Sequence, residues 1–106
     1  MTPDLIQNRR ELVKGWLSRT LLNAGSTGIT VNRIADAMGL SEASVYKQAS
    51  PVEENQLQAH NLIPLLDETG DFFILEELCR MFGGVFVPLG EPVEMLQVLV
   101  RALEVK

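Results

Sequence analysis

The side chains best suited to chemistry lie together in residues 41–48, Ser-Glu-Ala-Ser-Val-Tyr-Lys-Gln. Hydroxyl, amide and ammonium groups of these types form hydrogen bonds with the base edges and phosphates of DNA. Gln48 is suited to an adenine edge, Lys47 to guanine or phosphate, and Ala43 to a thymine methyl group. Tyr46 is expected to contact phosphate or to pack beneath its helix. The candidate base-reading residues are Ser41, Glu42, Ala43, Ser44, Tyr46, Lys47 and Gln48.

The residues around this run predict a helix-turn-helix that extends from residue 31 to residue 48. Ala35 is small enough to lie where two helices cross closely, and Gly39 suits a left-handed backbone at the end of the first helix. Ser41 is a natural N-cap for the second helix, which Val45 anchors in a small core. The rest of that core is expected to come from Ile34, Met38 and Leu40. Such a motif usually places its second helix in the DNA major groove, although the same corner also occurs in helical proteins that bind no DNA.

The chain has 106 residues and a net charge of −5, but its charges are unevenly distributed. Residues 1–50 hold six basic and four acidic side chains, whereas residues 51–106 hold three basic and ten acidic ones. The basic excess therefore lies in the half with the helix-turn-helix, and the acidic half is expected to face away from phosphate. The remaining candidate DNA contacts are Arg9, Arg10, Lys14, Arg19 and Arg33.

The first half is expected to begin with a helix over residues 3–24. Thr2 is its expected cap, Pro3 fits its first position, and Gly25 is expected to end it. Its apolar residues recur at helical spacing and predict a buried stripe of Val13, Trp16, Leu17, Leu21 and Ala24. Thr30 is the expected cap of the next helix.

Three further helices are expected after residue 50. Residues 50–53, Ser-Pro-Val-Glu, have the form of a capping box and predict a helix over residues 51–60. Another is expected from a cap at Asn61 to Thr69, and a third from a cap at Asp71 to residue 82, ended by two glycines.

The C-terminal segment combines a strand-like run with an apolar helix. Residues 85–89 are β-branched and aromatic, which predicts a short strand that Pro88 confines to an edge. The strand either packs as extended chain on helices or pairs with a second copy. Residues 91–106 predict a helix apolar on more than one face, which either contacts a second copy or closes the monomer core. The expected oligomerisation residues are Val85, Phe86, Val87, Leu89, Val93, Leu96, Val100 and Leu103.

Other chemistry finds little support in the sequence. His60 and Cys79 are the only histidine and cysteine, so no metal-ligand spacing is present, and no nucleophile motif accompanies them. The carboxylates of Asp67, Glu68 and Asp71 are interpreted as a solvated helix end. We therefore expect no enzymatic activity, no cofactor and no small-molecule substrate.

The compartment is expected to be the cytoplasm. The N-terminus lacks the layout of a signal peptide, and no apolar run approaches the roughly 20 residues that a membrane helix needs. A single cysteine fits a reducing environment.

Three segments resemble the temperate-phage regulatory protein CII family. They are residues 60–71, HNLIPLLDETGD, residues 75–80, LEELCR, and residues 83–89, GGVFVPL. With the helix-turn-helix, the likeness covers residues 20–90. It implies a helical DNA-binding protein of a phage or prophage that controls transcription in the choice between lysis and lysogeny.

Together these features predict a mainly α fold: a small helix-turn-helix domain with one short strand and a C-terminal oligomerisation helix. We expect a DNA-binding region in residues 1–50, a helical region in residues 51–90 and an oligomerisation helix in residues 91–106, within one compact unit. The expected partners are an operator-like site on double-stranded DNA and a second copy of the chain. The alternative is a protein-interaction module or antirepressor that keeps the helix-turn-helix shape without binding DNA.

Overall fold

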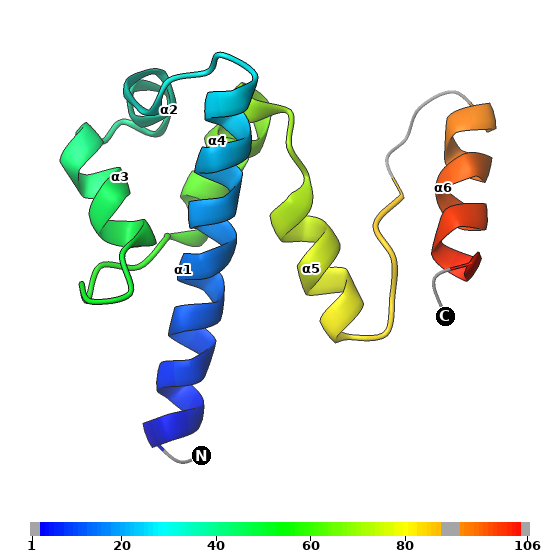
Figure 1. Ribbon diagram of the computed structural model, residues 1–106, viewed down its shortest axis with the longest axis horizontal. Helices are drawn as coiled ribbons and strands as arrows, with labels where there is room; N and C mark the ends of the chain where they lie inside the picture. The colour runs from blue at the N-terminus through cyan, green and yellow to red at the C-terminus, as the bar shows by residue number, and fades with distance from the viewer. Residues whose placement is uncertain (1–2, 88–91, 105–106) are drawn as a thin grey trace. The chain divides into compact units, whose positions relative to one another are not determined.

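The computed structural model describes residues 3–87 and 92–104, and these residues form six α-helices and one 3-10 turn (Figure 1). The elements in chain order are α1 (Pro3–Ser26), α2 (Val31–Met38), α3 (Glu42–Ala49), η1 (Ala59–Asn61), α4 (Leu62–Thr69), α5 (Phe73–Met81) and α6 (Pro92–Glu104). The chain divides into two compact units, Met1–Ile74 and Leu75–Lys106. The mainly helical fold predicted from the sequence is confirmed.

The core of the first unit forms where α1 and α2 pack against α3, and α4 packs against α2. Leu17 of α1, Ile34 of α2, Val45 of α3 and Leu65 of α4 have no exposed surface. Each helix is too short or too polar to be stable alone in water, so burial of these apolar side chains is what holds the unit together. The other buried apolar residues are Trp16, Leu21, Ala24, Ala35, Met38 and Ile74.

The turn between α2 and α3 has the capping pattern that the sequence predicts. The Thr30 hydroxyl accepts a hydrogen bond from the Arg33 amide, and the Ser41 hydroxyl accepts one from the Ser44 amide. Gly39 has a φ of 70°, and the next amide, that of residue 40, donates to the Ala35 carbonyl at 2.9 Å. These contacts satisfy backbone groups that a free helix end would leave without partners. The predicted helix-turn-helix is therefore confirmed as a local structure.

Two predictions about helices in this unit are wrong: the end of α1 and the presence of a helix over residues 51–60. Gly25 does not end α1, which continues to Ser26, and the left-handed turn comes at Gly28 with a φ of 86°. The helix expected over residues 51–60 does not form, since only η1 is helical there. The segment offers no apolar stripe to bury, and its Val52 side chain is 87% exposed. The serine expected to cap this helix instead ends α3, donating its amide to the Lys47 carbonyl.

The predicted ends of α4 and α5 agree with the structure. Asn61 precedes α4, but its side chain makes no capping hydrogen bond, so the predicted cap is wrong while the predicted start of the helix holds. Pro64 lies in the first turn, and Gly70 follows the helix with a φ of 65°. The Asp71 carboxylate accepts a hydrogen bond of 2.9 Å from the Phe73 amide at the start of α5. After α5, the Gly84 amide returns to the Cys79 carbonyl at 2.8 Å, as expected for a helix that ends at two glycines.

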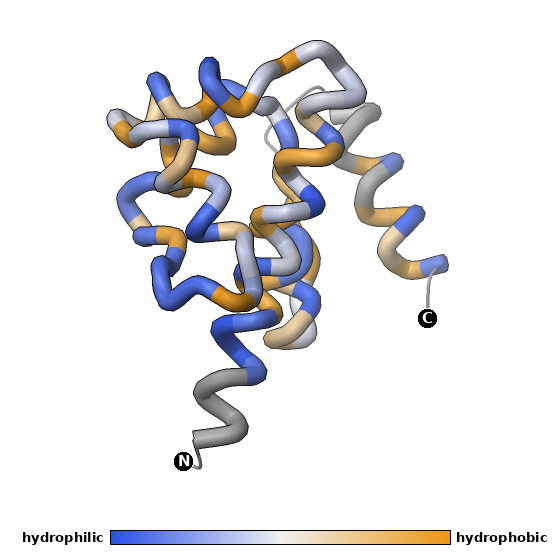
Figure 2. Tube along the Cα trace, turned by 60° about the vertical axis from the view of Figure 1, so that its left-hand side comes forward, coloured by the Kyte–Doolittle hydropathy of each residue, from blue (hydrophilic) through white to orange (hydrophobic). Residues whose placement is uncertain are grey.

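The strand predicted at residues 85–89 is not found in the part of the chain that the structure describes. Val85, Phe86 and Val87 have no regular secondary structure, and Leu89 lies outside the described residues. A strand needs a second extended segment to pair with, and the described chain offers none. The last helix is present as α6 and has Pro92 at its first position. Figure 2 shows hydrophobic and hydrophilic residues recurring in turn along α6.

Candidate nucleic-acid interface

One face of α3 is open to solvent and carries most of the predicted base-reading residues. Glu42, Ala43, Tyr46 and Lys47 are exposed, and the Tyr46 side chain is 53% exposed. Their spacing of one, four and five residues places them on the same side of the helix. Val45 is fully buried on the other side and fixes which face is presented.

The hydroxyls at the start of α3 serve the helix itself. The Ser41 hydroxyl accepts from the Ser44 amide at 3.1 Å and donates to the Ser44 hydroxyl at 2.9 Å. Ser41 is exposed and Ser44 is half-buried, so both lie at the accessible N-terminal end of the helix. The Ser41 hydroxyl therefore caps α3, and the Ser44 hydroxyl accepts a hydrogen bond from that capping group.

Gln48, predicted as a base-reading residue, is buried instead. Its side chain is only 7% exposed, and its Oε1 atom has no hydrogen-bond donor among the described residues. Gln48 follows the buried Val45 by three residues, and residues three apart in a helix share a face. The structure therefore does not present the Gln48 amide to an adenine edge, and the predicted pairing is not carried into the proposed interface.

Lys14, predicted as a phosphate contact, is also buried. Its residue is 3% exposed, and its Nζ atom donates to the carbonyls of Lys47 and Gln48, each at 3.2 Å, and to the carbonyl of Asn55. Burial lowers the pKa of the Lys14 ammonium, and the charge of the nearby Glu53 carboxylate partly opposes that shift. The ammonium is occupied by these three carbonyls inside the unit.

The four predicted arginines lie on the surface in different surroundings. Arg33 forms an ion pair with Glu68, and the guanidinium of Arg19 lies over the Phe73 ring, 5.2 Å from its centre. Arg9 and Arg10 are exposed on α1. Within the described residues, no hydrogen bond or ion pair engages the side chains of Arg10 and Lys47, so these two cations are the most available to a phosphate.

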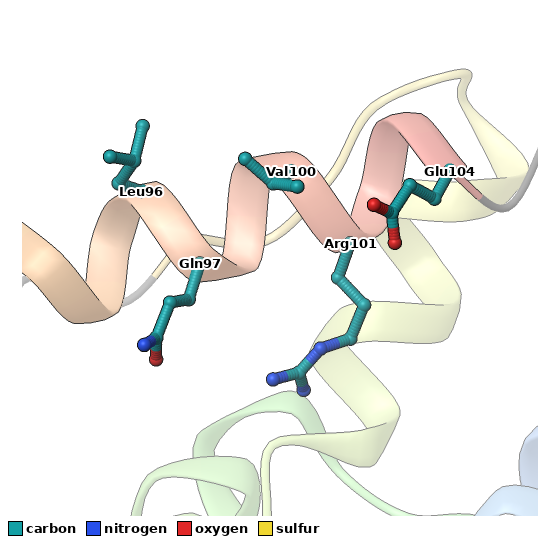
Figure 3. Close-up of a pocket in the computed structure, with 5 residues that line it drawn as sticks. All are labelled: Leu96, Gln97, Val100, Arg101 and Glu104. Atoms are coloured by element: carbon teal, nitrogen blue, oxygen red, sulfur yellow. The ribbon is translucent and has the colours of Figure 1, made fainter.

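The predicted oligomerisation residues lie in the second unit. Leu96, Val100 and Leu103 are 61%, 45% and 66% exposed, and Val85 is 51% exposed. Phe86 and Val87 are half-buried, whereas the side chain of Val93 lies outside the described set, as does the whole of Leu89. In Figure 3, Leu96 and Val100 project from one side of α6, and Gln97 and Arg101 project from the other. All five residues drawn there belong to α6, so the hollow that they line is the surface of one helix.

Neither a metal site nor a membrane span is found in the described ranges 3–87 and 92–104. No group of three or more His, Cys, Asp or Glu side chains there is placed to hold a metal ion. No helix in the same ranges has the length and apolar content needed to cross a membrane.

The contact at the end of α3 that sequence reasoning missed is the one made by Lys14. A signal for its burial exists in the sequence, because position 14 lies three residues before Leu17 and seven before Leu21, on the buried stripe of α1. The partners of the ammonium lie 33 to 41 residues away, and no local pattern identifies them.

Comparison with known proteins gives one family. The model of the family Phage regulatory protein CII (CP76) matches residues 21–106, which include α2, α3 and all later helices. No curated protein and no solved structure matches the chain.

Proposed function

This chain belongs to the phage regulatory protein CII (CP76) family, a family of transcriptional regulators rather than enzymes, and we propose that it is a sequence-specific DNA-binding regulator. In this proposal α3 is the recognition helix, and two or more copies of the chain bind together. The observation that carries the proposal is the open face of α3, held by a capped glycine turn on a buried three-helix packing.

Recognition would begin at the N-terminal end of α3, as in other helix-turn-helix proteins. Ala43 is suited to a thymine methyl group, Glu42 to a cytosine amino group and Lys47 to guanine or phosphate. Tyr46 lies on the same open face and is suited to a phosphate. Arg10, on α1, is the further phosphate contact of the proposal, because no hydrogen bond or ion pair in the described part of the chain occupies it.

Assembly is proposed through α6. Its exposed leucines and valine form an apolar stripe that a solvated helix does not need, and a second copy of α6 would remove that stripe from water. Two recognition helices related by a two-fold axis would then reach half-sites about 34 Å apart, one turn of DNA.

Selection of bound duplexes from a library with a randomised centre tests the proposal. A mobility-shift titration would then compare the selected duplex with a random one at fixed salt. A specific regulator is expected to prefer the selected duplex by about 10³-fold or more. Recovery of no preferred sequence, with equal affinity for both duplexes, would refute the proposal.

Two variants that each remove one positive charge test whether α3 is responsible for the preference for the selected duplex. Lys47→Ala is expected to lower affinity for the selected duplex by about 1–3 kcal/mol if the ammonium reads guanine. Arg101→Ala removes the same charge from the open surface of α6 and is expected to leave the preference unchanged. Equal losses in the two variants would indicate a general charge effect and would remove Lys47 from the interface.

A second candidate function is a protein-interaction module or antirepressor. The observation that favours it is the charge of the open face of α3, where Glu42 offsets Lys47. Nucleic-acid surfaces are usually strongly basic, and this face is close to neutral. Failure of the duplex selection, with the fold intact, would favour this second function.

A further inference from the structure

We infer that Lys14 is a positioning residue that fixes the orientation of α3 and, through it, the sequence preference of the protein. The inference rests on the proposed function and adds to it a buried residue outside the DNA-contacting face. The structural unit is the Lys14 clamp, defined as the Lys14 ammonium and the carbonyls of Lys47, Gln48 and Asn55.

The clamp joins three segments that lie far apart in the sequence. Lys14 comes from α1, the first two carbonyls from the last turn of α3, and Asn55 from the loop that follows. The last carbonyls of an α-helix have no partners within the helix, and a cation near that end also complements the helix dipole. Lys14 therefore adds a donor from another helix to the end of α3, where the Ser50 amide already donates to the Lys47 carbonyl and no glycine cap is present.

The chemistry of the ammonium suits this task. It has three N–H donors, and the clamp supplies three carbonyl acceptors, so the buried charge leaves no donor unpaired. The carboxylate of Glu53, on the same loop, contributes an opposite charge nearby. At 3% exposure the side chain is not available to a phosphate, so its influence on DNA has to pass through α3.

One residue connects the clamp to the open face. Lys14 holds the main-chain carbonyl of Lys47, while the Lys47 side chain is exposed on the face that is proposed to meet DNA. Base recognition depends on placing such side chains within a fraction of an ångström. Loss of these hydrogen bonds is expected to let the last turn of α3 fray, so that the Lys47 side chain occupies a wider range of positions. No phosphate contact is removed by that change.

The first measurement needs no DNA. Amide hydrogen exchange in the full chain would compare the wild-type protein with Lys14→Met and Lys14→Arg. In Lys14→Met, exchange in residues 48–50 and in the loop is expected to be about tenfold faster or more, because hydrogen bonds to a charged group are lost. Lys14→Arg keeps a cation and is expected to recover part of the protection. Unchanged exchange in Lys14→Met would overturn the inference. If Lys14→Met does not fold, Lys14→Gln decides, because it removes the charge and keeps a polar side chain: wild-type protection throughout α3 in that variant would also overturn the inference.

The second measurement separates positioning from phosphate contact. Affinity for a selected and a random duplex would be measured over a range of salt concentrations, with Arg10→Ala as the control. If Lys14 is a positioning residue, Lys14→Met is expected to lose about tenfold or more of its preference for the selected duplex and to keep the wild-type salt dependence of binding. If Lys14 instead contacts a phosphate, the slope of log affinity against log salt concentration is expected to be smaller by about one, with the preference kept. A wild-type protein without sequence preference would refute the proposed function, and the exchange experiment would still decide whether the clamp holds α3.

Discussion

Two glycine-to-alanine substitutions are expected to change the stability of the first unit in opposite directions. Gly39 ends α2 with a φ of 70°, and Gly15 lies inside α1, where its backbone is helical. Apart from the neighbouring backbone, a Cβ atom added at either position would meet no atom within 4 Å. The two changes therefore add the same methyl group to equally open space, and only the backbone conformation differs.

The backbone sets the sign and the size of each effect. In the left-handed region a Cβ atom lies too close to the following carbonyl oxygen, so Gly39→Ala is expected to lower the free energy of unfolding by about 1–2 kcal/mol. In a helix interior alanine loses less conformational entropy than glycine, so Gly15→Ala is expected to raise it by about 0.4–1 kcal/mol. In a domain of 60–100 residues, each kcal/mol corresponds to about 4–8 °C in melting temperature.

Thermal unfolding followed by circular dichroism measures both shifts. Gly39→Asn is the matched control, because asparagine tolerates the left-handed region better than alanine, and its loss is expected to be the smaller one. If Gly39→Ala melted at or above the wild-type temperature, the turn between α2 and α3 would not require a positive φ. The reasoning about the helix-turn-helix geometry would then be wrong.

Three further predictions concern residues of the first unit. Ala35 is 2% exposed, so Ala35→Leu is expected to overpack the core at a cost of about 1–3 kcal/mol, measured by urea denaturation. Arg10→Ala is expected to weaken binding to all duplexes alike and to reduce the salt slope by about one, and an effect confined to one sequence would contradict the phosphate assignment. Burial lowers the pKa of Lys14 below 10.5, so between the lowered value and 10.5 the folded chain binds fewer protons than the unfolded chain. The free energy of unfolding should therefore rise with pH across that window, and a Lys14→Met variant that shows the same rise would exclude this cause.

The parts of the fold that the sequence predicts well are those with causes only a few residues away. Thr30, Ser41 and Asp71 cap their helices through amides two or three residues later, and Gly39 acts through its own φ. Such contacts are set by the local chain, and the rest of the fold preserves them. The helix expected over residues 51–60 failed because its proposed capping serine already ends α3.

The candidate site was harder to predict, because exposure depends on which face of a helix meets the core. Gln48 and Lys14 both have side chains typical of DNA contacts, and both are buried against the α1–α3 packing. For Gln48 the spacing from Val45 would have revealed the inward face. The partners of Lys14 depend on how α1 crosses α3, which is a tertiary property that no residue spacing encodes.

The small number of base-reading side chains on α3 makes assembly a requirement of the proposed function. With Gln48 buried, Glu42 and Lys47 are the charged groups on the open face, and each good base contact contributes only about 1–3 kcal/mol of discrimination. One copy of α3 therefore discriminates weakly, and two copies on one duplex double the free energy of discrimination.

The apolar stripe of α6 can be tested for that role with two neighbouring substitutions. Leu96→Glu places a charge in the stripe, and Gln97→Glu places the same charge on the other side of the helix (Figure 3). Light scattering is expected to show an oligomer for the wild-type chain and for Gln97→Glu at tens of micromolar, and a monomer for Leu96→Glu, because burial of the new carboxylate without a partner is costly. Affinity for a selected duplex should fall with the loss of the oligomer, while circular dichroism shows the helices intact. A wild-type chain that is monomeric at that concentration would refute assembly through α6, and specificity would then have to come from a single α3 with few groups to provide it.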